Sequence, residues 1–215
     1  MNLHLKTYGI GQKSGRISID SNGISFAEKT LLVDDIQNIS SSLKVAREML
    51  YTSINSKITL TTSSDSMTFK FCGTDSMISK RANEVLENFM TIRTAVIQHI
   101  GPGILNRMIQ RMSGGGDVHI GKFTFNHKGI TTKSVMRGEL RAGWHEDFEV
   151  RPKAKENMFL KCLNFGATSR EACDHWEIYY HNQAIGKMIN LGEFSFDDSN
   201  GCMIPFLISY IKEIQ

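Results

Sequence analysis

The chain has 215 residues, of which 40% are hydrophobic and 22% are charged, and its formal net charge is +3. These proportions are typical of a folded globular protein and exclude a disordered or low-complexity chain. So small a charge predicts neither a nucleic-acid nor a membrane partner, although residues 101–155 carry ten basic and only five acidic side chains.

A short pattern occurs twice, at residues 15–25 and again at residues 121–131. The two copies share their glycine spacing, an alternation of apolar and hydroxyl residues, and a basic residue after the first glycine. Such a repeat favours a duplicated domain. In each copy the alternation predicts a strand, and Asn22-Gly23 or Lys128-Gly129 predicts a tight turn with a positive glycine φ. We therefore expect a β-hairpin at the start of each copy.

A second correspondence follows each hairpin and aligns Asp35 with Asp147 and Ile36 with Phe148. The second copy has about six extra residues in the intervening loop, and loops accommodate such insertions at little cost. Residues 43–52 could form either a strand or a helix. Further strands are expected at residues 57–62, 67–71, 158–163, 176–181 and 185–191.

Each copy is expected to close on an amphipathic helix. In the first copy an apolar stripe from Ile78 to Ile100 predicts a helix that ends at Gly101-Pro102-Gly103. Residues 104–112 then read as a short additional helix, and residues 113–116 as a glycine hinge. In the second copy Ser199 or Asn200 can cap a helix that has Pro205 in its first turn. The expected domains are residues 1–100 and 117–215, joined by the linker 101–116.

These repeated residues resemble those of the pleckstrin-homology (PH) superfold, specifically bacterial PH-like domains. In the first copy the matching residues are Ile17, Ile19, Gly23, Ile24, Val33, Asp35, Ile36 and Ile39. In the second copy they are Phe123, Phe125, Gly129, Ile130, Trp144, Asp147, Phe148 and Val150. The resemblance implies a mainly β fold with α (α+β): two bent antiparallel sheets or barrels, each closed by a C-terminal amphipathic helix.

The same superfold supports lipid binding, peptide binding and scaffolding, so the resemblance alone does not determine a ligand. Phosphoinositide-binding members carry a basic cluster across the first hairpin. This chain departs from that pattern, because its first turn, residues 20–23, is acidic and polar, and its second offers only His127-Lys128.

The basic stretch in the second copy is the main candidate for a binding surface. Its members are Lys128, Lys133, Arg137, Arg141, Arg151, Lys153 and Lys155. Such a stretch could dock anionic lipid head groups, an acidic protein segment or nucleic-acid phosphates. The alternative is an ordinary solvated surface, because four acidic residues between positions 139 and 149 reduce its net charge.

Cysteine and histidine spacing gives one enzymatic hypothesis. Cys173, His175 and His181 would share one face of a strand, where they could be ligands of a metal-dependent hydrolase. An ordinary exposed strand face is the favoured alternative, because the first copy has no counterpart. The four cysteines lie far apart without a Cys-x-x-Cys pair, so neither a disulfide framework nor a zinc ribbon is expected.

The sequence as a whole favours a non-enzymatic binding or adaptor module that is cytoplasmic, uses no cofactor and has a protein partner. No apolar run suggests a signal peptide or a membrane span. The alternative function is a sensor of membrane surfaces or polyanions, with nucleic acid the less favoured ligand. That sensor would use Arg137, Arg141, Arg151, Lys153 and Lys155.

Overall fold

A computed structural model describes residues 2–5, 15–26, 28–47, 52–76, 79–134, 138–153 and 175–214. These residues form four small antiparallel sheets and two α-helices, so the predicted mainly β class with α is confirmed. The chain divides into two compact units, Met1–Asn106 and Arg107–Gln215, called unit 1 and unit 2 below. Neither helix among the described residues is long and apolar enough to cross a bilayer.

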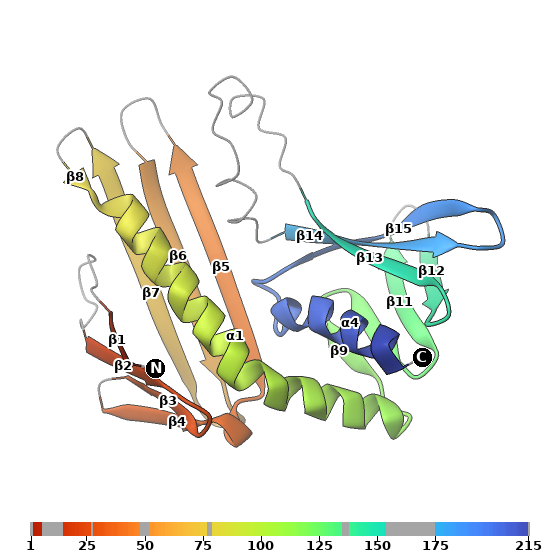
Figure 1. Ribbon diagram of the computed structural model, residues 1–215, viewed down its shortest axis with the longest axis horizontal. Helices are drawn as coiled ribbons and strands as arrows, with labels where there is room; N and C mark the ends of the chain where they lie inside the picture. Colours follow the sequence, from red (N-terminus) through yellow and green to blue (C-terminus); the bar gives the residue numbers. More distant parts are fainter. Residues whose placement is uncertain are drawn as a thin grey trace. The chain divides into compact units, whose positions relative to one another are not determined.

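Unit 1 contains two four-stranded meanders followed by a helix (Figure 1). The first sheet consists of β1 (Asn2–Leu5), β2 (Gly15–Ile19), β3 (Gly23–Phe26) and β4 (Lys29–Leu32), and a short 3-10 helix, η1 (Val33–Asp35), follows it. The second sheet consists of β5 (Asn38–Arg47), β6 (Thr52–Thr61), β7 (Ser66–Ser76) and β8 (Ser79–Lys80). Helix α1 (Arg81–Ser113) begins directly after β8.

The two sheets of unit 1 and α1 share one apolar core. Phe69 of β7 packs edge-on against Phe26 of β3, with ring centroids 5.5 Å apart, and Phe71 packs against Phe89 of α1 at 5.3 Å. The inward side chains of β2, Ile17 and Ile19, are completely buried. The alternation that predicted β2 therefore arises because one face of the strand lines this core.

Unit 2 has the order of a four-stranded meander, a three-stranded meander and a helix. The first sheet consists of β9 (Val118–Ile120), β10 (Phe123–Asn126), β11 (Gly129–Ser134) and β12 (Gly138–Gly143). The second consists of β13 (Asp147–Pro152), β14 (His175–Asn182) and β15 (Lys187–Ser195), and it is followed by η2 (Gly201–Met203) and α4 (Ile204–Ile214).

Helix α4 packs its apolar face into the core of unit 2. Its buried residues are Ile204, Leu207, Ile208 and Ile211. In the last turn of the helix, Lys212 Nζ donates a hydrogen bond of 2.7 Å to the carbonyl oxygen of Phe148 in β13. The two sheets meet through Phe123 and Phe194, whose ring centroids are 6.4 Å apart.

The repeated sequence pattern forms the same hairpin in both units. In unit 1 Ile17 pairs with Phe26, and in unit 2 Phe123 pairs with Thr132, so both partners are displaced by 106 residues. The turns match as well. The Asp20 carboxylate accepts a hydrogen bond from the Asn22 amide at 2.8 Å, and the Asn126 side-chain oxygen accepts one from the Lys128 amide at 3.0 Å.

The glycine after each turn is needed chiefly because the next strand approaches closely. A Cβ atom on Gly23 would lie 2.4 Å from the Leu31 carbonyl oxygen, and one on Gly129 would lie 2.0 Å from that of Ala142. Gly129 has the expected positive φ of 150°, but Gly23 is not among the described glycines with positive φ. The positive φ predicted for Gly23 is therefore wrong, and close packing explains the residue instead.

The predicted end of the first helix at Gly101-Pro102-Gly103 is also wrong, because α1 runs through Pro102 to Ser113. A proline inside a helix costs about 3 kcal/mol. The apolar stripe continues past it, and every fourth residue is buried at Val96, Ile100, Ile104, Met108 and Met112. Burial of this stripe offsets the cost of the proline, so the separate helix predicted at residues 104–112 is part of α1.

The glycines predicted as a hinge form the C-terminal cap of α1. The Gly114, Gly115 and Gly116 amides donate hydrogen bonds of 2.9 to 3.0 Å to carbonyl oxygens of the last helical turns. Gly115 has a φ of 82°, the left-handed conformation in which many helices end. The boundary between the two units falls inside α1, between Asn106 and Arg107.

The strands predicted at residues 67–71 and 176–181 are confirmed within β7 and β14. Those predicted at residues 57–62 and 185–191 are confirmed at residues 57–61 of β6 and 187–191 of β15, whereas Ile185 and Gly186 lie in the turn before β15. The ambiguous residues 43–47 belong to strand β5. The strand predicted at residues 158–163 lies outside the described residues. Asn200 precedes η2 with a φ of 61° and makes no capping side-chain hydrogen bond there, and α4 follows η2 directly with Pro205 in its first turn.

Candidate functional site

The outward face of the β9–β12 sheet, called the β9–β12 face below, carries the polar side chains of unit 2 that converge best. Directly paired residues of antiparallel strands point to the same side of a sheet. The registers therefore place His119, Thr124, Thr131 and Arg141 in one row across all four strands. The inward residues of β10, Phe123 and Phe125, are buried beneath this face.

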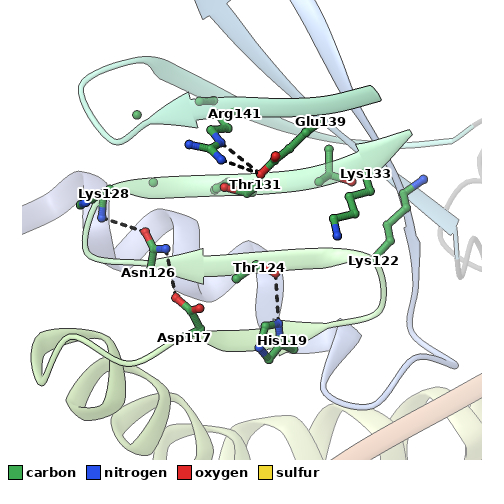
Figure 2. A pocket seen from close by; sticks show the side chains of 15 residues that line it. Asp117, His119, Lys122, Thr124, Asn126, Lys128, Thr131, Lys133, Glu139 and Arg141 are labelled. Carbon is green, nitrogen blue, oxygen red and sulfur yellow. Dashed lines mark hydrogen bonds and ion pairs between the residues drawn. The ribbon is translucent and has the colours of Figure 1, made fainter. Parts of the chain in front are cut away.

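An open pocket of about 870 Å³ lies on the β9–β12 face, and Figure 2 shows it from close by. Thr124 and Thr131 line its centre. Its charged lining residues are Lys122, Lys128, Lys133, Arg141, Asp117 and Glu139. Cations therefore outnumber carboxylates around the pocket, and hydroxyl groups lie between them.

Both carboxylates of the pocket already have partners. The Asp117 carboxylate accepts a hydrogen bond of 3.0 Å from Asn126 Nδ2, and the Glu139 carboxylate lies 3.0 Å from the Arg141 guanidinium. Both interactions are drawn in Figure 2. Arg141 and Glu139 are exposed, so their ion pair contributes little to stability.

The three lysines of the pocket differ in their surroundings. Lys122 Nζ lies 5.7 Å from the centroid of the Phe123 ring. Its aliphatic chain passes over Gly192 of β15, where a Cβ atom would come within 2.8 Å of Lys122 Cε. Lys128 and Lys133 are exposed, and their ammonium groups have no carboxylate partner in the described part of the chain.

The basic stretch expected to form one surface is divided between two sheets. Lys128, Lys133 and Arg141 lie on the β9–β12 face. Arg151 and Lys153 lie on or directly after β13 in the other sheet of unit 2. Arg137 and Lys155 lie outside the described residues.

The two basic residues of the β13 region are paired with acids. Arg151 Nε donates a hydrogen bond of 2.6 Å to Glu149, and its guanidinium lies 4.9 Å from the centroid of the Tyr179 ring. This hydrogen bond lowers the pKa of Glu149 and raises that of Arg151. Lys153 forms an ion pair with Glu193, which raises the pKa of Lys153. These cations are therefore less available to a ligand than Lys128 and Lys133.

Several outward polar residues of the β13–β15 sheet are hydrogen-bonded to one another. The Tyr179 hydroxyl donates to Glu177 Oε2, and Asn190 Nδ2 donates to Glu177 Oε1, both at 3.0 Å. Partial burial and the Glu177 hydrogen bond together raise the pKa of Tyr179. The carboxylates of Glu149, Glu177 and Glu193 on this sheet thus each have a hydrogen-bond partner, whereas Asn190 Oδ1 is buried without one.

The metal hypothesis places its two described histidines at the ends of one strand. His175 and His181 are six residues apart on β14, which corresponds to about 20 Å, too far for two ligands of one ion. Cys173 lies outside the described residues. No group of three or more His, Cys, Asp or Glu side chains suited to a metal occurs in the part of the chain that the structure describes.

Lys122 lines this pocket although it is not among the residues assigned to the binding surface from the sequence. It stands at the start of the basic stretch and follows the first glycine of the second copy of the repeated pattern. In the unit 1 hairpin the corresponding residue is Arg16, and the hydroxyl row consists of Ser18, Ser25 and Thr30. Ser25 and Thr30 bond to each other at 2.9 Å. The hydroxyl pattern is therefore common to both units, whereas the cluster of lysines belongs to unit 2.

Comparison with protein-family models, with curated proteins and with solved structures gave no match to this chain.

Proposed function

We propose that the chain is a non-enzymatic binding module of two PH-like units, and that unit 2 binds an acidic segment of a partner protein on the β9–β12 face. The observation that carries the proposal is the pocket on that face. Four cations line it, and the two carboxylates among its described lining residues are already engaged. Four cations against two carboxylates leave a net formal charge of +2 around the pocket, so an anionic segment would meet net positive charge.

The order of elements supports the PH-like part of the proposal. In both units a four-stranded meander precedes a second meander, and a helix with a buried apolar stripe follows. The hairpins β2–β3 and β10–β11 have the same register and the same turn hydrogen bond. A fold of this kind is a scaffold, and its function depends on the site that it carries.

The shape and spacing of the pocket favour an extended acidic chain. Lys128 precedes β11 and Lys133 lies near its end, so they are five residues or about 17 Å apart along the strand direction. A peptide with several carboxylates can reach both lysines at once. The floor formed by Thr124 and Thr131 lies in a hollow, which a chain can enter and a flat bilayer surface cannot.

The lining residues also disfavour single-stranded nucleic acid. Proteins that bind single strands without sequence preference stack the bases on aromatic side chains. The described residues that line this pocket include no Phe, Tyr or Trp. Charge alone would thus have to provide the affinity.

A direct test is the binding of a short fluorescent peptide rich in Asp and Glu, measured by fluorescence anisotropy with the full chain. The double change Lys128→Glu and Lys133→Glu should weaken binding about tenfold or more, because it replaces attraction with repulsion at both ends of the pocket. Binding of the unchanged chain should also weaken with added salt, since both lysines are exposed.

The matched control is the double change Lys44→Glu and Lys187→Glu, two exposed lysines away from the pocket. It alters the net charge by the same amount and should leave the affinity within about twofold. Equal losses in both double variants would show that net charge, not this face, attracts the peptide. Tight binding of vesicles containing phosphatidylserine, with none of the peptide, would favour the membrane-surface alternative instead.

A further inference from the structure

One end of the β9–β12 face brings two lysines to neighbouring cross-strand positions. Phe123 of β10 pairs with Thr132 of β11. Lys122 precedes Phe123 and Lys133 follows Thr132, so the two lysines come next to each other across the two antiparallel segments. Both line the pocket, and Figure 2 shows them at the same end of it, with Lys128 at the other end. This position will be called the Lys122/Lys133 end.

Like charges directly opposite each other on neighbouring strands are unfavourable, and an anion bound between two such ammonium groups would offset their repulsion. Glu139 is the cross-strand partner of Lys133 on β12, but its carboxylate forms an ion pair with Arg141. Lys122 has Glu193 in its neighbourhood, and that carboxylate is paired with Lys153. The nearby acids are therefore committed to other cations.

The sheet also restricts where Lys122 can lie. Its aliphatic chain rests over Gly192, which has no side chain to displace it, and its ammonium group lies beside the Phe123 ring. Gly192 has a φ of 140° and pairs with Ile178 at the point where the β14–β15 register shifts. The bulge thus leaves the space in which Lys122 lies along the pocket edge.

Hydroxyl groups complete the surroundings of this end. Thr124 and Thr131 pair directly with each other, one position further along the hairpin than Phe123 and Thr132, and both line the pocket. The Thr124 hydroxyl lies within hydrogen-bond distance of His119 Nδ1, at 3.0 Å, so the donors that this end offers to an anion with several oxygens are the two ammonium groups and the Thr131 hydroxyl. A phosphate monoester has three acceptor oxygens and a charge near −2 at neutral pH, whereas a carboxylate has two oxygens and a charge of −1.

We infer that the Lys122/Lys133 end is a subsite for a phosphorylated Ser or Thr side chain within the acidic segment. This inference rests on the proposed binding of such a segment to the same face. It assigns the other end, at Lys128, to ordinary carboxylates of the segment.

The experiment compares three short acidic peptides that differ only at a central position, which is Ser, Glu or phosphoserine. Anisotropy with the full chain should show the phosphoserine peptide binding at least about fivefold more tightly than the Glu peptide. The double change Lys122→Gln and Lys133→Gln should reduce this ratio to below about twofold. The control Lys128→Gln should weaken all three peptides by a similar factor and preserve the ratio.

The outcomes separate this inference from the proposed function. Equal binding of the Glu and phosphoserine peptides would overturn the subsite and leave the acidic-segment proposal standing. The same conclusion would follow if the double change Lys122→Gln and Lys133→Gln did not alter the ratio of the two affinities. Binding of none of the peptides would overturn both. Vesicles containing phosphatidylinositol phosphate form a further arm, and binding to them in place of the phosphopeptide would assign the phosphate to a lipid and overturn the inference. All variants are exposed substitutions, and far-UV circular dichroism verifies that they fold.

Discussion

Asp20 and Asn126 occupy the same place in the two hairpins, but only Asp20 can carry a charge. The Asp20 carboxylate accepts hydrogen bonds from the amides of Asn22 and Gly23, at 2.8 and 3.1 Å. The bond from Asn22, and then that from Gly23, lowers the pKa of Asp20 below its ordinary value of 3.8, because these bonds favour the charged form. Asn126 forms the corresponding turn with a neutral amide.

The hairpin of unit 1 should therefore be sensitive to acid through Asp20. Since its pKa in the folded state is lower than in the unfolded state, its contribution is complete above about pH 4 and disappears as the pH falls through the folded value. Asp20→Asn should keep most of the stability at neutral pH and lose less of it in acid than the unchanged chain. Urea unfolding followed by far-UV circular dichroism at a series of pH values measures both effects.

The matched control for this prediction is Glu28→Gln, which removes an exposed carboxylate close to the same hairpin. This variant should lose stability in acid as the unchanged chain does. If Asp20→Asn and the unchanged chain showed the same loss between about pH 4 and pH 2, the turn would not be the source of the acid sensitivity.

At the scale of single elements, the hairpins could be predicted from the sequence and the end of α1 could not. The alternation of apolar and polar residues at Phe123, Thr124 and Phe125 predicts a strand from the local sequence alone, because only one face of the strand is buried. The Gly-Pro-Gly segment is a strong local signal to end a helix. It is overruled by the burial of Ile104, Met108 and Met112 in the following turns, which the local sequence does not determine.

This explanation of α1 predicts that Pro102 is tolerated rather than required. Pro102 is exposed, and replacing it with alanine restores a backbone N–H inside the helix. Pro102→Ala should stabilise the chain by about 1–3 kcal/mol in urea unfolding, whereas Gln98→Ala, an exposed change one turn earlier, should have an effect within about 0.5 kcal/mol. Destabilisation by Pro102→Ala would mean that the proline maintains a bend on which the packing of α1 depends.

At the scale of the whole molecule, the two units share a hairpin but present different chemistry on it. Charge density in the sequence located Lys128, Lys133 and Arg141 of the β9–β12 face. It could not separate them from Lys153, because the partner of that residue, Glu193, lies 40 positions further along the chain and is brought close only by strand pairing. Long-range pairing of this kind determines which cations remain available to a ligand, and it cannot be predicted from the local amino-acid sequence.

The central claim is that the β9–β12 face of unit 2 is the surface that binds an acidic partner, and amide chemical-shift mapping tests it most directly. An acidic peptide would be titrated into the isotope-labelled full chain. The largest shifts should occur at the amides of Thr124, Thr131, Lys133 and Arg141, with much smaller changes at Arg151 and Ser25. Largest shifts in the β13–β15 sheet or in unit 1, or no shifts at a saturating peptide concentration, would contradict the claim.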